Sequence, residues 1–307
     1  MISQVELSVI IPVYNGEDFI EGTVESVLTH SNGFGVECIV IDDGSSDRTP
    51  GILSKYQDKI RLYSQPNSGE SAAVNVGLQL AHGRYVLIVS ADDPVFSSLL
   101  FEGVTTFFEE NPDVVAWYPD WRLIDECGRI LKDVHLPDYD FRDLFSRNKV
   151  LPGPGTWIRK TTALEIGGRN SRWKYVGDYD FWLRLSQHGS LVHRNSVLAQ
   201  WRKHARSTSI SERGPKMAEE RMSVIEEFIR ANVGALDSRE IRLARAHSFY
   251  LAARLGFFSK SVSSKKLFFQ SLRTDFRVIK SIKLYEAIFM MTFPLSKYFV
   301  DFLAKLR

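Results

Sequence analysis

The chain of 307 residues lacks the features that mark several large classes of protein. It has only two cysteines, Cys38 and Cys127, which argues against the disulfide framework of a small secreted domain and favours a reducing compartment. Its formal net charge of +2 is too close to zero to indicate a nucleic-acid partner. No uninterrupted apolar run is long enough to cross a bilayer, and no basic leader precedes the first short one, so we expect neither a membrane span nor a signal peptide.

Two glycine-rich phosphate-binding motifs are missing as well. No G-x-G-x-x-G follows the first apolar run, and no G-x-x-x-x-G-K-[ST] occurs anywhere in the chain. These absences argue against dinucleotide binding of the Rossmann type and against a P-loop. A bound nucleotide would have to be held by other groups.

What the chain does contain is the composition of an ordinary globular protein and an alternating pattern in its first half. Three short apolar runs rich in β-branched residues predict buried strands, and the segments between them have the spacing of amphipathic helices. The strands are expected at residues 7–11, 36–41 and 85–89, and the helices at residues 16–29, about 47–56 and 72–81. This alternation predicts an α/β fold with a mostly parallel sheet flanked by helices.

The pattern changes after residue 113. Residues 113–134 read as strands broken by turns at 119–120 and 126–128, which predicts a small antiparallel extension of the sheet. The prolines and glycines of residues 149–158 predict a loop leading into a short strand. Residues 178–187 read as a helix that opens with acidic side chains.

The last third of the chain is helical in pattern and basic in charge. We expect a domain boundary near residue 212, with one domain over 1–212 and a helical extension over 213–307. Within residues 260–307, ten lysines and arginines stand against three acids and are interleaved with aromatic residues. This composition suits helices lying on an anionic membrane surface, and it equally suits a helical subdomain that packs its aromatic side chains inward.

Two pairs of adjacent aspartates stand where predicted strands end. Asp42 and Asp43 follow the second strand, and Asp92 and Asp93 follow the third. In open α/β sheets ligands bind outside the carboxyl ends of the strands, so acids placed there can share a cation or accept hydrogen bonds from a nucleotide. Oxygen ligands favour Mg²⁺ or Mn²⁺, and either ion bridges readily to a diphosphate. Each pair by itself fits a turn or a helix cap equally well.

Four segments of the chain together resemble family-two inverting glycosyltransferases with the GT-A fold. In order they are VIIPVYNGEDFI, IVIDDGSSDRT, QPNSGESAAVNVGLQLAHGRYVLIVSADD and GDYDFWLRL, and the resemblance covers roughly residues 6–209. It implies a metal-dependent, inverting hexosyltransferase that moves a sugar from a UDP- or dTDP-activated donor to an acceptor hydroxyl. The acceptor would be a saccharide or lipid-linked saccharide in polysaccharide or glycoconjugate assembly, and residues 1–212 would form the catalytic domain.

The resemblance also implies roles for individual residues on the donor side. The loop after the first strand would frame the nucleotide, Asp43 would read its base, and the segment before the third helix would pass beneath the donor. Tyr14 fits the apolar core as an alternative. The residues so assigned are Pro12, Tyr14, Asn15, Glu17, Asp43, Asn67, Gly69, Ala73, Asn75, Ala91, Asp92 and Arg202.

Metal binding is implied for Asp92, with Asp93 beside it and His204 meeting the metal or the diphosphate. Arg202 would pair with phosphate oxygens. The chain departs from the commonest metal motif of the family, because Ser90 stands where that motif has an acid. A serine hydroxyl can hold a metal-bound water but adds no charge, so the strictness of the Mg²⁺ or Mn²⁺ dependence is open.

The proton acceptor implied by the resemblance is Asp178, at the start of the predicted helix over 178–187. An inverting transfer needs a base opposite the leaving diphosphate, and Asp178 suits this role unless it only caps its helix. Asp180 is the lesser candidate because it faces elsewhere on the helix. The expected acceptor side consists of Asp120, Trp121 and Trp157, for which packing is the alternative.

Two other functions remain open from the sequence. The first is a catalytically impaired nucleotide-sugar-binding protein, prompted by Ser90. The second is a nucleotidyltransferase, which would release pyrophosphate, although the chain lacks a basic glycine-rich first loop. We expect a cytoplasmic protein that associates peripherally with the inner face of the plasma membrane if the C-terminal segment binds lipid.

Overall fold

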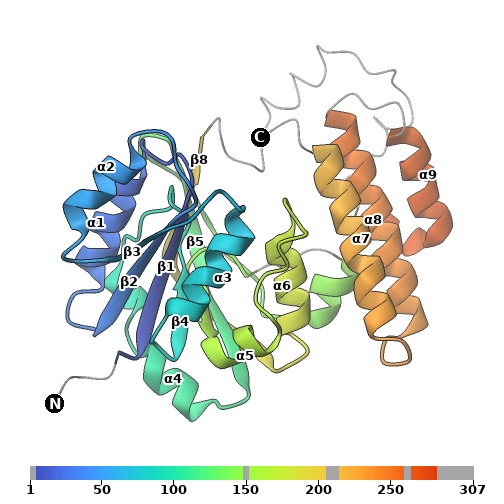
Figure 1. Cartoon of the computed structure of the whole chain (residues 1–307). Coiled ribbons are helices and arrows are strands. Elements are labelled where there is room, and N and C mark those ends of the chain that lie inside the picture. Colours follow the sequence, from blue (N-terminus) through green and yellow to red (C-terminus); the bar gives the residue numbers. More distant parts are fainter. Residues whose placement is uncertain (1–4, 148–151, 205–213, 259–263, 282–307) are drawn as a thin grey trace. The chain divides into compact units, whose positions relative to one another are not determined.

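The structure is a computed structural model and describes residues 5–147, 152–204, 214–258 and 264–281 (Figure 1). The chain divides into two compact units. The first contains residues 1–139 and 150–204, and the second contains residues 140–149 and 205–307. The expected boundary near residue 212 falls outside the described residues and stays a prediction.

The first unit is built on one mixed sheet with the strand order β3-β2-β1-β4-β7-β5-β6, and β8 also pairs with β5. Strands β1 to β4 are mutually parallel, β7 runs antiparallel to β4 and β5, β6 runs antiparallel to β5, and β8 runs parallel to β5. The bounds are β1 (Leu7–Val13), β2 (Val36–Asp42), β3 (Arg61–Ser64), β4 (Tyr85–Ile88), β5 (Val114–Asp125), β6 (Ile130–Val134), β7 (Trp157–Arg159) and β8 (Ser190–Lys203). The predicted α/β fold, with its mostly parallel sheet and small antiparallel part, is confirmed.

Helices cover both faces of this sheet, as the alternation of side chains along β1 requires. Val9 and Ile11 belong to one buried cluster with α1 and α4. Ile10 points to the other face, where α3 approaches so closely that a Cβ added at Gly77 would lie 2.3 Å from its Cγ2. Burial of each such valine or isoleucine contributes about 1.5–3 kcal/mol. The helices are α1 (Ile20–His30), α2 (Thr49–Leu53), η1 (Ser54–Tyr56), α3 (Glu70–Leu80), η2 (Ser98–Leu100), α4 (Val104–Glu110), α5 (Lys160–Glu165) and α6 (Gly177–Leu185).

The long strand β5 differs from the sequence-based expectation. The turn predicted at Pro119 and Asp120 is wrong, because β5 runs through both residues. Its pairing with β8 is irregular at this point, with register shifts on either side of Asp120. Such an irregularity lets a strand accept a proline, which has no N–H to donate to the ladder. The second predicted turn is confirmed as the β5–β6 connection, where Gly128 has a φ of +82°.

The second unit is helical in its described residues, as expected for the end of the chain. Its elements are a π-helical turn η3 (Asp143–Arg147), α7 (Gly214–Ala231), α8 (Ser238–Phe258), α9 (Ser264–Thr274) and a 3₁₀ segment η5 (Phe276–Ser281). Phe145, Phe228 and Phe268 are buried within it, and the rings of Phe145 and Phe228 lie 5.6 Å apart. Arg245 on α8 forms a two-pronged ion pair with Glu226 on α7. Among the described residues, no helix has the length and apolar character needed to cross a membrane.

Candidate functional site

The candidate site lies where the parallel strands end and the order of the sheet reverses. The chain passes from β1 outward to β2 and β3 and then returns to β4 on the opposite side of β1. Because β1, β2 and β4 are parallel neighbours, the residues that follow them meet at one edge of the sheet. The Asp43 amide donates to the Val13 carbonyl over 2.8 Å. This reversal is the usual ligand position in open α/β sheets.

The loop after β1 is bound to the loop after β2. Asn15 adopts a φ of +51° and accepts a hydrogen bond from the Ser46 amide over 2.8 Å. Glu17 accepts hydrogen bonds from the amide and the side chain of Arg48, both over 3.0 Å. The hydrogen bond from the Arg48 amide is the main reason why the pKa of Glu17 lies below its ordinary value. Asn15 and Glu17 therefore shape this double loop.

Two other predicted residues of the first loop have different surroundings. Pro12 is buried inside β1, and its missing N–H disrupts no pairing with β4, because that ladder ends at Ile10. Tyr14 is 53% exposed, which excludes the alternative that it belongs to the core. Its side chain is thus available to a ligand at the end of the sheet.

Asp43 organises the segment that leads into α3. Its Oδ1 accepts hydrogen bonds from the Gln65 side chain over 2.7 Å and from the Ser68 amide over 2.9 Å. Its Oδ2 accepts from the amide of Gly69, which has a φ of +90°. The carboxylate is almost completely buried, so these bonds fix the course of residues 65–69. Asn67 in this segment is exposed, and the predicted contact between Asp43 and a base stays a prediction.

The start of α3 lies against the segment that carries Asp178. Asn75 on α3 donates to the Arg169 carbonyl and accepts from the Arg169 amide, each over 2.7 Å. Nearer the start of the helix, a Cβ added at Gly177 would lie 2.6 Å from the Ser71 Oγ. Asn75 thus acts as a clamp between two segments distant in sequence, while Ala73 beside it is buried. These contacts place the first turn of α6 beside the first turn of α3.

The two acids of α6 have opposite environments. Asp178 is exposed in the first helical turn and accepts a hydrogen bond from the Tyr179 amide over 2.7 Å. The helix-capping position is occupied by Val176, so Asp178 does not cap the helix. Asp180 is buried and bound to Arg184, with distances of 2.6 and 2.8 Å. Asp178 can therefore meet a ligand, whereas Asp180 is engaged in the structure of its helix.

The end of β8 folds onto the end of β4. His204 Nε2 lies 2.7 Å from Asp92 Oδ2, and its ring lies 4.8 Å from that of Phe19. Asp93 is buried and accepts a hydrogen bond from the Arg202 amide over 2.7 Å. Burial, together with the neighbouring charge of Asp92, raises the pKa of Asp93 well above its ordinary value. Asp92 and Asp93 are therefore not equivalent, because only Asp92 is partly exposed.

Arg202 and Ala91 complete this part of the site. The Arg202 guanidinium donates to the main-chain carbonyls of Asp92 over 2.9 Å and Glu126 over 2.8 Å, and it lies 5.1 Å from the Phe19 ring centre. The Ala91 carbonyl accepts the Thr23 hydroxyl over 2.8 Å. A phosphate contact by Arg202 would have to compete with these carbonyls.

Asp92, which follows β4, and His204, which follows β8, fit a divalent ion that takes most of its ligands from a bound substrate and water. Asp92 and His204 offer one carboxylate and one imidazole side by side. Within the part of the chain that the structure describes, no group of three or more His, Cys, Asp and Glu side chains is arranged to hold a metal. Mg²⁺ is commonly bound through one or two carboxylates and completed by substrate phosphates and water, so a set of this size is sufficient when a diphosphate is bound.

The three residues expected on the acceptor side are placed very differently. Asp120 is fully buried between His135 Nδ1 and His193 Nε2, at 2.8 and 2.7 Å. Trp157 is also fully buried, and its indole N–H donates to the Leu100 carbonyl over 2.8 Å. Trp121 is half-buried. Of the three, only Trp121 has surface available to a ligand, so packing accounts for Asp120 and Trp157.

Sequence reasoning did not find several residues that this geometry depends on. His135 and His193 hold Asp120, Phe19 supports His204, and Ser71 contacts the start of α6. Phe19 and Ser71 lie within the segments that carry the family resemblance but had no assigned role, and His135 and His193 lie outside those segments. Their importance comes from contacts between distant segments.

The sequence comparisons connect the chain with glycosyltransferases. The family profile "Glycosyl transferase family 2" matches residues 8–158. The putative teichuronic acid biosynthesis glycosyltransferase TuaG of Bacillus subtilis is 31% identical over 202 residues, covering 64% of this chain and 78% of TuaG. The uncharacterized glycosyltransferase RP339 of Rickettsia prowazekii is 30% identical over 213 residues, covering 66% of this chain and 65% of RP339. The match to YibD of Escherichia coli, at 32% identity, spans about half of that protein (51%).

Solved structures of glycosyltransferases share the fold of this chain. TarS 1–349 of S. aureus in complex with UDP-GlcNAc has a TM-score of 0.66 and 20% identity, covering 87% of this chain and 79% of that chain. The mannosyltransferase PcManGT from Pyrobaculum calidifontis, in complex with GDP-Man and Mn²⁺, has a TM-score of 0.55 and 15% identity, covering 98% and 80%. With the profile match, the relatives and this GT-A fold in agreement, the chain belongs to glycosyltransferase family 2.

Proposed function

We propose that the chain is an inverting glycosyltransferase that transfers a sugar from a UDP- or dTDP-sugar to an acceptor hydroxyl in polysaccharide or glycoconjugate assembly. The observation that carries this proposal is the run of contacts along one edge of the sheet. Asp43 holds the segment before α3, α3 contacts the start of α6, and His204 contacts Asp92. The donor is suggested by TarS, which was solved with UDP-GlcNAc and with UDP. The acceptor class is suggested by the name of TuaG.

The donor would occupy the ends of β1, β2 and β4. The exposed Tyr14 and Asn67 belong to the two segments that border this position, and their side chains are free to follow a ligand. Asn15, Glu17 and Asp43 act mainly through the backbone they hold. Holding the donor and the acceptor hydroxyl together converts a bimolecular reaction into a nearly unimolecular one.

A divalent ion, Mg²⁺ or Mn²⁺, would be held by Asp92 with His204 beside it, and a fold neighbour was solved with Mn²⁺. When bound, such an ion acts as a Lewis acid that neutralises charge on the departing diphosphate. We assign Asp93 a positioning role, because its buried carboxylate binds the Arg202 amide and so holds the strand end that carries His204. Because Ser90 provides no carboxylate, the diphosphate and water are left to complete the ligand set.

Asp178 would act as the base. As the bond between the acceptor oxygen and the anomeric carbon forms, the bond to the diphosphate oxygen breaks and the hydroxyl proton passes to the Asp178 carboxylate. Its exposure in the first turn of α6 supports this role, and the ion pair between Asp180 and Arg184 argues against Asp180. The half-buried Trp121 offers an aromatic face for an acceptor sugar.

A screen of nucleotide sugars tests the proposal. Thermal unfolding is measured with UDP-, dTDP- and GDP-sugars in the presence of Mg²⁺, Mn²⁺ or a chelator, because a ligand that binds only the folded state raises the melting temperature. We expect one UDP- or dTDP-sugar to stabilise the protein and to release its nucleoside diphosphate. Asp92→Asn should remove the metal-dependent part of this stabilisation. The exposed Asp58 provides the matched control, Asp58→Asn.

The same screen separates the other candidate functions. Binding without release of a nucleoside diphosphate in the presence of saccharide acceptors would support the impaired binding protein. Release of pyrophosphate from a nucleoside triphosphate and a sugar phosphate would support a nucleotidyltransferase. If no nucleotide sugar changes the melting temperature, the proposed function is wrong.

We also propose that the protein works in the cytoplasm, peripherally at the inner face of the plasma membrane. The free thiols of Cys38 and Cys127 support a reducing compartment. The basic and aromatic composition of residues 260–307 supports contact with an anionic surface. Of this segment, residues 260–263 and 282–307 lie outside the described residues. Cell fractionation that recovers the protein only from an oxidising compartment would contradict the location.

A further inference from the structure

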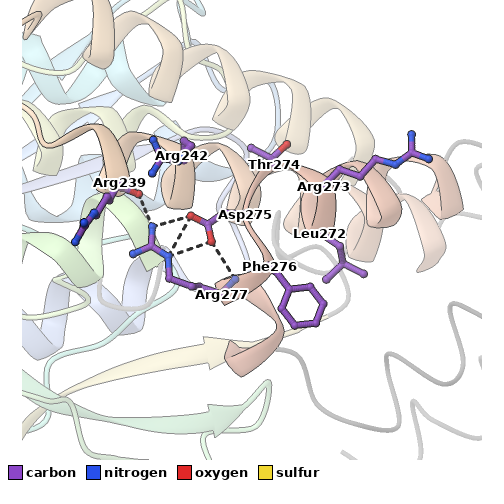
Figure 2. Close-up of a pocket in the computed structure, with 8 residues that line it drawn as sticks. All are labelled: Arg239, Arg242, Leu272, Arg273, Thr274, Asp275, Phe276 and Arg277. Atoms are coloured by element: carbon purple, nitrogen blue, oxygen red, sulfur yellow. Dashed lines mark hydrogen bonds and ion pairs between the residues drawn. The ribbon is translucent and has the colours of Figure 1, made fainter.

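A basic cleft of about 500 Å³ lies within the second unit, and none of the residues assigned to sugar transfer lines it (Figure 2). It is bordered by the start of α8, the end of α9 and η5. The charged and aromatic residues that line it are Arg239, Arg242, Arg273, Asp275, Phe276 and Arg277. Four arginines therefore surround a single acid.

That acid is already neutralised by one of the arginines. The Arg277 guanidinium lies 2.6 Å from the Asp275 carboxylate, whose side chain is only 9% exposed. The side-chain hydrogen bond from Arg277 is the main reason why the pKa of Asp275 lies below its ordinary value. Arg277 also donates to the Arg239 carbonyl over 2.7 Å, which ties η5 to α8. Figure 2 shows this arrangement at the centre of the cleft.

The other three arginines have no such partner. Arg239, Arg242 and Arg273 are exposed, and none of them forms a side-chain ion pair with another described residue. An adjoining pocket of about 390 Å³ shares Arg239 and Arg277 and adds Arg142, Asp237 and Glu240. Across both pockets five arginines face three acids, so the region is positive overall.

One of the added acids is also engaged by the fold. The Asp237 carboxylate accepts hydrogen bonds from the amides of Arg239 and Glu240, at 2.6 and 3.3 Å, in the first turn of α8. An acid at that position stabilises the start of its own helix. These amide bonds are the main reason why the pKa of Asp237 lies below its ordinary value, and the charges of Arg239 and Arg242 lower it further.

We propose that this cleft binds a phosphate mono- or diester through Arg239 and Arg242, which lie on the same side of Asp275 in Figure 2. Guanidinium groups match phosphate oxygens in two-pronged, charge-assisted hydrogen bonds, and the excess of arginines over acids leaves positive charge that a phosphate can offset. Phe276, which also lines the cleft, is 65% exposed, and Ile279 of the same segment η5 is 42% exposed. A cationic cleft with an apolar rim suits the phosphate of a lipid headgroup, and the same arginines would also take a soluble phosphate ester.

Binding by the full-length protein tests the proposal with two probes. The first is sedimentation with phosphatidylcholine vesicles, with and without phosphatidylglycerol, and the second is titration with glycerol phosphate. The test variant is R239Q/R242Q, which removes two cleft charges. The control is K265Q/K266Q, which removes two charges from exposed positions of α9 outside the cleft lining. Arg242→Gln alone is a second test if the double variant fails to fold.

We expect the cleft variant to weaken binding of at least one probe by about tenfold or more, and the control by less than about twofold. Loss confined to the phosphatidylglycerol vesicles identifies a lipid headgroup, and loss confined to glycerol phosphate identifies a soluble ester. The proposal is overturned if the wild type binds neither probe. It is also overturned if the two double variants lose binding equally, because attraction would then come from diffuse charge. Sugar transfer does not enter either measurement, so the result is independent of the proposed function.

Discussion

Two aspartates separated by one residue should respond in opposite ways to the same substitution. Asp178 is exposed, and its carboxylate oxygen accepts the Tyr179 amide, a bond that an asparagine oxygen can also accept. Asp180 is buried and receives two hydrogen bonds from Arg184. Asp178→Asn should therefore remove a base without disturbing the fold, whereas Asp180→Asn should disturb the fold.

The expected magnitudes follow from these contacts. Loss of a positioned base lowers turnover by about 10²–10⁴-fold, or about 3–5 kcal/mol in the activation barrier. The free energy of unfolding of Asp178→Asn should stay within about 0.5 kcal/mol of the wild type, as for most surface changes. For Asp180→Asn, replacing a charged acceptor by an amide should lower the free energy of unfolding by about 1–3 kcal/mol. The Arg184 guanidinium would keep its hydrogen bonds to the carbonyls of Ile166 and Gly168.

Both quantities are measured on the same preparations. Initial rates of nucleoside diphosphate release give turnover, and chemical denaturation gives stability. Donor affinity, from the shift in melting temperature with added nucleotide, should change little in Asp178→Asn because a base acts on the chemical step. Turnover of Asp178→Asn within a few-fold of the wild type would refute its role as base, and a large loss of stability would refute the reading of its environment.

Three further outcomes are expected. Asn75→Ala removes both hydrogen bonds to the Arg169 backbone and should lower the free energy of unfolding by about 1–3 kcal/mol, as measured by denaturation. Kinetic measurements should show that it lowers turnover more than donor affinity. Unchanged turnover would argue against the clamp. Burial opposes ionisation of Asp120, but the hydrogen bonds to its carboxylate hold the pKa of Asp120 below the ordinary value. The ionised side chain therefore contributes to stability above about pH 3.9, and this contribution is lost as the pH falls through the folded-state pKa. Melting curves from neutral to acidic pH should show this loss in the wild type and less of it in Asp120→Asn. Trp157→Ala should destabilise by about 3–5 kcal/mol, whereas Trp121→Ala should mainly raise the KM for the acceptor; equal stability losses would contradict their different burial.

The sequence alone identified the elements whose signals are local. The strands at β1, β2 and β4 follow from apolar runs that end in polar turns, and the helices between them follow from apolar spacing. Parallel strands with short connections lead directly to a common edge, so the acids after β2 and β4 could be assigned to one end of the sheet. The ordered set of motifs then indicated the family that the comparisons confirmed.

Other features depended on contacts that no local pattern encodes. Strand β8 was not predicted, because its exposed and half-buried side chains have no clear alternation, and its partner β5 lies far away in the sequence. The same holds for the roles of Asp93, Asn75 and Trp157. Each of these side chains is defined by a partner at least 57 residues distant.

Sequence therefore determined which residue types arrive at the edge of the sheet, because backbone periodicity and turn chemistry act over a few residues. Tertiary structure decided which of them remain open to a ligand. Asp178 and Asp180 stand on the same helix turn, and packing buries only Asp180, whose partner Arg184 is itself held by the carbonyls of Ile166 and Gly168. Burial and hydrogen bonding are properties of the packed chain, and they distinguish side chains that are chemically identical in the sequence.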